Sequence, residues 1–94
     1  METPELRQQA WIGDAVLSLF ARRWILREKG AMDGELHTRM TSNHFLATFG
    51  KPTEIEARIG RVFEDEGLDA ACAYIQTEIL PRFLAQERKE RGRR

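Results

Sequence analysis

The chain has 94 residues, of which 41% are hydrophobic and 32% charged, and its formal net charge at pH 7 is zero. This composition is typical of a soluble globular protein rather than a disordered one, except at the chain ends, and the length predicts one small domain near the lower limit for a self-supporting core. Because Cys72 is the only cysteine, the chain cannot form an internal disulfide, and its histidines and cysteine do not have the spacing of a zinc finger. Neither a membrane-spanning apolar run nor a signal-peptide pattern occurs, so we expect a cytoplasmic protein with no membrane partner.

The charges are unevenly distributed along the chain. Residues 1–81 carry nine Lys or Arg against thirteen Asp or Glu, whereas residues 82–94 carry six against two. We therefore expect a helical domain over residues 1–86 and a basic C-terminal tail over residues 87–94. A basic tail beside an acidic body suits contact with nucleic-acid phosphates. The alternative interpretation of the tail is a frayed helix end whose charges face solvent. The candidate phosphate contacts are Arg88, Lys89, Arg91, Arg93 and Arg94.

One long helix is expected near the N-terminus. Thr3 is a good capping residue ahead of Pro4 at the first helical position, and the next clear stop is Gly30. Apolar and small residues recur between them at helical spacing, which predicts a largely buried, central helix. The residues of this stripe are Leu6, Ala10, Gly13, Val16, Leu17, Phe20, Ala21, Trp24 and Ile25.

Capping residues and prolines divide the rest of the chain into further helices. A second helix is expected to start at Asp33-Gly34, and a short third one is capped by Thr41 or Ser42 and ends at Gly50. A fourth helix starts at Pro52 and ends at Gly67, and Asp69 caps the last helix. Pro81 should end or kink that last helix. No segment alternates apolar and polar residues over the length of a β-strand, and no internal repeat occurs. The predicted fold class is therefore all-α, a compact helical bundle.

Asp14 is anomalous within the first helix. It lies one turn from Ala10 and from Leu17, on a stripe otherwise built of apolar and small residues. A carboxylate held against a core needs a cation, a metal ion or several hydrogen bonds. Gly13 beside it costs roughly 1 kcal/mol relative to alanine in a helix, which a close approach of another backbone or of a ligand would explain.

Glu56 has the same character, because it precedes Ile59 by three residues and Gly60 by one turn. If the two glycines mark a close crossing of helices, Asp14 and Glu56 face each other and offer oxygen ligands to a hard divalent cation. Mg²⁺ commonly takes one or two protein carboxylates and keeps its waters. The residues alone leave an alternative open, in which both carboxylates pair with arginines. Candidate partners are Arg22, Arg39 and Arg58.

These residues lie in segments that resemble the catalytic domain of the ribonuclease III family. Residues 9–17, QAWIGDAVL, are similar to the signature helix of the family, and residues 53–60, TEIEARIG, to its second acidic motif. Four shorter segments resemble further landmarks in the same order along the chain. They are residues 33–36 (DGEL), 41–47 (TSNHFLA), 67–71 (GLDAA) and 79–81 (ILP).

The chain departs from the family pattern at two acidic positions. Ala10 stands where the signature has its first glutamate, and Thr53 stands where the second motif has an aspartate. The mini-ribonuclease III branch is similar in this respect, with alanine at the first position and no aspartate at the second. The resemblance therefore implies a shortened member of that branch, with Asp14 and Glu56 as the remaining catalytic acids.

The resemblance implies a Mg²⁺-dependent endoribonuclease, with Mn²⁺ as a second possible cation, that cleaves double-stranded or structured RNA. Asp14 and Glu56 would hold the cation, and Thr53, one turn from Glu56, could orient a water. Glu54 lies about 200° around the helix from Glu56 and is not expected to join them. Ribosomal-RNA maturation and a homodimer are further implications. The alternative is an inactive protein of the same fold that binds RNA or associates with the ribosome.

The remaining conspicuous residues have ordinary interpretations. Trp11 and Trp24 are expected to be core or dimer-interface anchors rather than base-stacking platforms, since a duplex exposes no base faces. His37 and His44 are expected at the surface or near helix caps, and Cys72 in the core.

Overall fold

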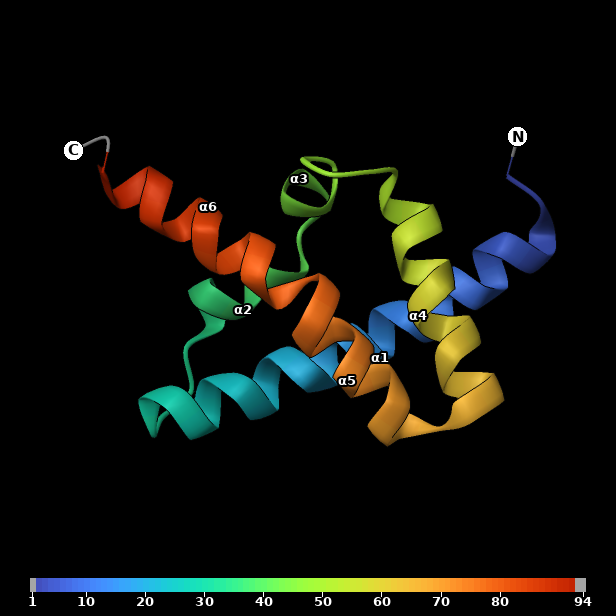
Figure 1. Ribbon diagram of the computed structural model, residues 1–94, viewed down its shortest axis with the longest axis horizontal. Coiled ribbons are helices and arrows are strands. Elements are labelled where there is room, and N and C mark those ends of the chain that lie inside the picture. Colours follow the sequence, from blue (N-terminus) through green and yellow to red (C-terminus); the bar gives the residue numbers. More distant parts are fainter. Residues whose placement is uncertain (1, 93–94) are drawn as a thin grey trace.

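Residues 2–92 are described here from a computed structural model of the chain, shown in Figure 1. The described residues form helices and no strand, which confirms the all-α class. The helices are α1 (Pro4–Lys29), α2 (Gly34–Thr41), α3 (Asn43–Leu46), α4 (Pro52–Glu66), α5 (Leu68–Glu78) and α6 (Leu80–Gly92). Within this part of the chain, no helix is both long and apolar enough to span a membrane.

The ends of α1 are set by the two residues that the sequence predicts. The Thr3 hydroxyl accepts a hydrogen bond from the Leu6 amide at 3.1 Å, which satisfies one of the free N–H groups of the first turn. At the other end Gly30 adopts a left-handed conformation, φ 71°, and its amide donates to the Leu26 carbonyl. Glycine takes this conformation at little cost, so the helix stops there.

The later helices differ from the expected limits at two places and agree with them at a third. The structure contradicts the prediction that Asp69 caps α5, because the cap is Gly67, whose φ of 96° turns the chain directly into Leu68. Helix α3 is only one turn long and leaves Phe49 outside it. The expected break at Pro81 is present, because α5 ends at Glu78 and a new helix, α6, starts at Leu80. Pro81 is the second residue of α6, where its missing N–H removes no hydrogen bond within that helix.

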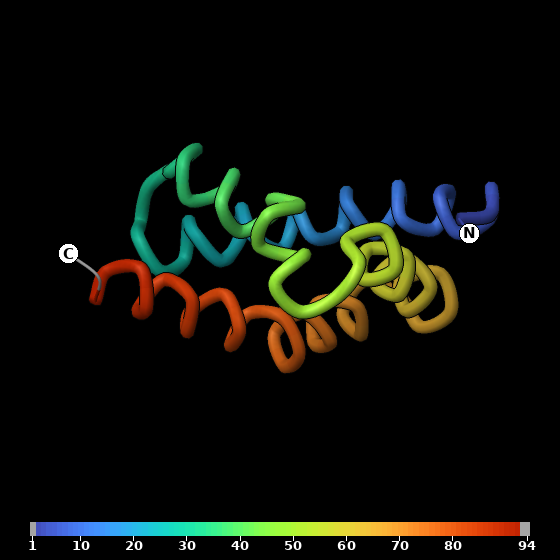
Figure 2. Tube along the Cα trace, turned by 90° about the horizontal axis from the view of Figure 1, so that it is seen from above, coloured from blue at the N-terminus to red at the C-terminus, as the bar shows by residue number. Residues whose placement is uncertain are grey.

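Helix α1 is the central element, and α4 crosses it with the most extensive contact between any two helices (Figure 1). In the view from above, α1 lies along one side of the molecule and α5 and α6 lie along the other (Figure 2). The core between them is apolar. Its most completely buried large side chains are Leu17, Phe45, Leu46, Ile59 and Ile75.

Helix α6 runs through the expected boundary at residue 87 without a break and ends at Gly92. Phe83 anchors it, with its ring 5.2 Å from that of Phe45 in an edge-on arrangement. Farther along, Arg39 of α2 donates two hydrogen bonds to the Glu87 carboxylate, both at 3.1 Å. Arg88, Lys89 and Arg91 therefore lie on a helix, whereas the tail residues at positions 93 and 94 are outside the described residues.

Candidate functional site

The crossing of α1 and α4 is as close as two backbones allow, because each helix contributes a glycine to it. A Cβ atom added to Gly13 would overlap the Glu56 carbonyl oxygen and would lie 2.9 Å from the Gly60 amide nitrogen. A Cβ atom on Gly60 would likewise overlap the Gln9 carbonyl oxygen and lie 3.2 Å from the Gly13 amide nitrogen. The close crossing that the two glycines predict is confirmed.

This crossing brings Asp14 and Glu56 together. Glu56 is half-buried, and its side chain is within hydrogen-bonding reach of the Asp14 carboxyl group. Burial disfavours the charged form of Glu56, and both the hydrogen bond and the repulsion from Asp14 add to that effect. Together they raise the pKa of Glu56 to about 8. At neutral pH the pair therefore holds a proton that two separate carboxylates would release.

Asp14 itself is exposed, so the expectation that it lies against the core is wrong. The neighbouring positions Ala10, Gly13 and Leu17 are buried, because α4 covers that stripe of the helix. Asp14 follows Gly13 by about 100° of helical rotation, which places it at the edge of the covered stripe. The pair thus lies where solvent, or a ligand from solvent, can reach it.

Pairing with arginines, the alternative left open by the sequence, does not occur within residues 2–92. No ion pair in this range includes Asp14 or Glu56, and Arg39, one of the three candidate partners, binds Glu87 instead. No cation of the described chain therefore neutralises the carboxylate pair.

The candidate oxygen ligands are the carboxylates of Asp14 and Glu56 and, one turn before Glu56 in the sequence, the hydroxyl of the half-buried Thr53. Glu54 is exposed and lies 3.8 Å from the Lys51 ammonium, away from the pair, as its position on the helix predicts. In residues 2–92 no group of three or more His, Cys, Asp or Glu residues is placed to hold a metal ion.

The carboxylate pair fits a hard divalent cation of the magnesium type. Such a cation is satisfied by one or two protein carboxylates when water and phosphate oxygens complete its shell. A cation held between the two carboxylates would also offset the repulsion from Asp14, which adds to the effect of burial on the pKa of Glu56. Asp14 and Glu56 are the residues that would hold it.

A hydrogen bond that sequence reasoning missed lies one turn farther along α1. The Ser18 hydroxyl is 2.9 Å from Nε2 of His37 on α2. His37 is half-buried by this contact, whereas His44 is exposed as expected. No sequence signal pairs Ser18 with His37, because the two residues lie on separate helices that only tertiary packing brings together. The bond ties α2 to the part of α1 that carries the candidate site.

The exposed side of α1 carries large apolar side chains, and one of them, Trp11, lies one turn before Asp14. Trp11 is 78% exposed, Leu26 50% and Leu19 40%, so the core interpretation of Trp11 is wrong. Trp24 packs partly buried against the core, as does Cys72. Burial raises the pKa of the Cys72 thiol, which disfavours the thiolate form.

Comparison with known proteins adds no assignment: no family model, no curated protein and no solved structure matches the chain.

Proposed function

We propose that the protein is a Mg²⁺-dependent endoribonuclease of ribonuclease III type that cleaves double-stranded or structured RNA, with precursor ribosomal RNA as one substrate. The observation that carries this proposal is the contact between Asp14 and Glu56 at the crossing of α1 and α4. The motifs in residues 9–17 and 53–60 support it, because they contain these two acids and the two glycines of the crossing.

In this proposal each residue of the site has a separate task. Asp14 and Glu56 hold the cation, and Mn²⁺ can replace Mg²⁺ because both prefer oxygen ligands. Once bound, the cation would supply Lewis-acid stabilisation of the charge that develops on the scissile phosphodiester, and a more acidic water. Thr53 lies one turn before Glu56 and orients a water through its hydroxyl. Gly13 and Gly60 fix the distance between the two carboxylates.

The basic part of α6 is the proposed contact with RNA phosphates. Arg88, Lys89 and Arg91 are exposed on α6, which runs toward the end of the molecule opposite the N-terminus (Figure 1). Contacts of this kind are independent of base sequence and weaken with salt. They would hold a duplex by its backbone while the carboxylate pair acts on one phosphodiester.

A homodimer is part of the same proposal. Trp11, Leu19 and Leu26 follow one another along one exposed side of α1, and Trp11 precedes Asp14 by one turn. Burial of this surface by a second copy would place two carboxylate pairs in one particle, as cleavage of both strands of a duplex requires. Sedimentation should give the mass of two chains for the wild type and of one chain for Trp11→Asp. A wild-type monomer at concentrations of about 100 μM contradicts the dimer.

The second candidate function is an RNA-binding or ribosome-associated protein that retains the fold without activity. The observation that favours it is the small number of acids at the site, since Ala10 and Thr53 occupy two positions that are acidic in the family.

Incubation with a duplex RNA in Mg²⁺ separates the two candidates. The nuclease predicts discrete shorter products that EDTA abolishes. Binding of the duplex with no product, at enzyme concentrations above those of the RNA, supports the inactive RNA-binding protein instead.

A further inference from the structure

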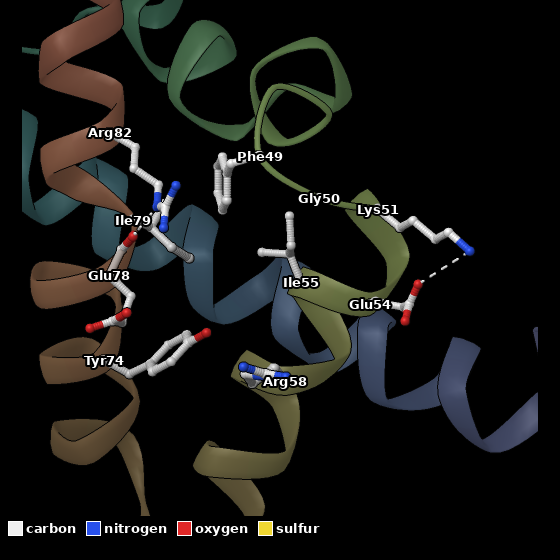
Figure 3. A pocket seen from close by; sticks show the side chains of 10 residues that line it. All are labelled: Phe49, Gly50, Lys51, Glu54, Ile55, Arg58, Tyr74, Glu78, Ile79 and Arg82. Atoms are coloured by element: carbon white, nitrogen blue, oxygen red, sulfur yellow. Dashed lines mark hydrogen bonds and ion pairs between the residues drawn. The ribbon is translucent and has the colours of Figure 1, made fainter.

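We propose that a second site, on the side of α4 away from the carboxylate pair, binds a single nucleotide. A pocket of about 520 Å³ lies between α4, the start of α6 and the α5 helix (Figure 3). This volume is in the range of pockets that hold small organic molecules. The inference is independent of the proposed nuclease function, because none of the residues that carry it belongs to the carboxylate pair.

The polar lining of the pocket points to an anionic group. Arg58, Tyr74 and Arg82 line it, and Figure 3 shows the Tyr74 hydroxyl directed into the space between the two arginines. Arg58 makes no hydrogen bond or ion pair within residues 2–92, and Arg82 uses only its Nε, which donates to the Glu78 carbonyl at 3.1 Å. The remaining guanidinium N–H groups and one O–H group can donate to phosphate oxygens.

Two carboxylates also line the pocket, and they do not cancel this charge. Glu54 lies at the rim, 3.8 Å from the Lys51 ammonium, and Figure 3 shows this pair on the outer side of α4. Glu78 contributes the second negative charge, against the positive charges of Arg58 and Arg82. The lining therefore keeps one net positive charge next to the Tyr74 hydroxyl, which suits an anion better than a cation.

The apolar lining indicates that the anion carries a flat organic body. Ile55 and Ile79 face the pocket from opposite sides, and Phe49 closes its upper end in Figure 3. The Arg82 guanidinium lies 4.8 Å from the centre of the Phe49 ring, so a cation–π contact exists at that end. A nucleobase can pack against these two groups, since aromatic rings and guanidinium planes are the usual platforms for single bases. A nucleoside monophosphate combines this ring with the required phosphate.

Calorimetric titration with AMP, in EDTA and without Mg²⁺, tests the site directly. AMP should bind at least tenfold more tightly than adenosine or inorganic phosphate alone, because only AMP uses both parts of the pocket. Arg58→Gln should weaken AMP binding about tenfold and Tyr74→Phe severalfold, through the loss of hydrogen bonds to the phosphate. Arg22→Gln, which removes the same charge from an exposed position on α1, should leave the affinity unchanged. Circular dichroism verifies that each variant is folded.

Three results overturn the proposal: no saturable binding of AMP at millimolar concentration, equal affinities for AMP and adenosine, or equal losses in Arg58→Gln and Arg22→Gln. The bound nucleotide can be a free mononucleotide or an unpaired nucleotide of an RNA chain. Titration with a 5′-phosphorylated single-stranded hexanucleotide distinguishes these two sources. Tighter binding than AMP identifies an unpaired nucleotide of an RNA chain, and equal binding identifies a free mononucleotide. This experiment measures binding without Mg²⁺, so absence of AMP binding would leave the proposed nuclease function untouched.

Discussion

Asp14→Asn and Glu56→Gln are each expected to slow Mg²⁺-dependent cleavage of duplex RNA by about a thousandfold or more. Both substitutions keep the size of the side chain and remove one of the two charges that the proposed cation needs. A thousandfold loss corresponds to about 4 kcal/mol of transition-state stabilisation, a magnitude typical of a lost metal ligand. The measurement is the single-turnover rate of cleavage with enzyme in excess over a labelled duplex.

Glu64→Gln is the matched control for this experiment, because Glu64 is an exposed acid on the same helix, two turns from Glu56. Its cleavage rate should equal that of the wild type. RNA binding should survive in all three variants, since the proposed phosphate contacts lie on α6. Cleavage by Asp14→Asn or Glu56→Gln at a rate similar to Glu64→Gln would show that the pair is not the catalytic site.

Gly13→Ala is expected to lower the free energy of unfolding by more than about 3 kcal/mol. Alanine in place of glycine normally stabilises a helix by up to about 1 kcal/mol. At this position the added methyl group overlaps the Glu56 carbonyl oxygen, and a backbone atom cannot move aside as a side chain does. The helices must separate, which exposes part of the core in a small domain whose total stability is about 5 to 15 kcal/mol.

Gly34→Ala provides the comparison for this second prediction. Gly34 begins α2, and apart from its chain neighbours and the backbone of its own helix no described atom lies within 4 Å of a Cβ added there. We expect this variant to unfold at the same urea concentration as the wild type or at a slightly higher one. Equal midpoints for Gly13→Ala and Gly34→Ala would mean that the crossing of α1 and α4 is looser than the structure indicates.

The sequence predicts the crossing because its signal is local. Glycine inside a helix is unfavourable, so Gly13 and Gly60 need a reason, and two such residues beside unexplained carboxylates indicate a close contact. The limits of α1 are predictable for a similar reason, since Thr3 and Gly30 act on backbone groups within one helical turn.

The exposure of Asp14 and Trp11 could not be predicted in the same way. Helical periodicity defines a stripe on α1, but the width of that stripe depends on which neighbours cover it. Helix α4 covers Ala10 and Gly13 and leaves the adjacent residues open. The pocket around Arg58 and Arg82 has no sequence signal, because it joins side chains of α4 and α6 that only tertiary packing brings together.

The central claim is that Asp14 and Glu56 form one cation-binding pair, and it has a consequence for stability. The pKa of Glu56 is about 8 in the folded protein and 4.5 without the fold. The folded state therefore binds this proton more tightly, and the resulting stability is present below pH 4.5 and is lost as the pH rises through 8. Since Glu56 is only half-buried, we expect a loss of about 1 kcal/mol at pH 8 rather than the full value of the shift.

The most direct test is the free energy of unfolding of the wild type and of Glu56→Gln at pH 8, without and with Mg²⁺. Without the cation, Glu56→Gln should be more stable by about 1 kcal/mol, because it has no charge to repel Asp14. Saturating Mg²⁺ should stabilise the wild type by about 1 to 3 kcal/mol and leave Glu56→Gln nearly unchanged, which reverses the order. Equal effects of Mg²⁺ on both proteins, or no effect on the wild type, would contradict a cation site at this pair.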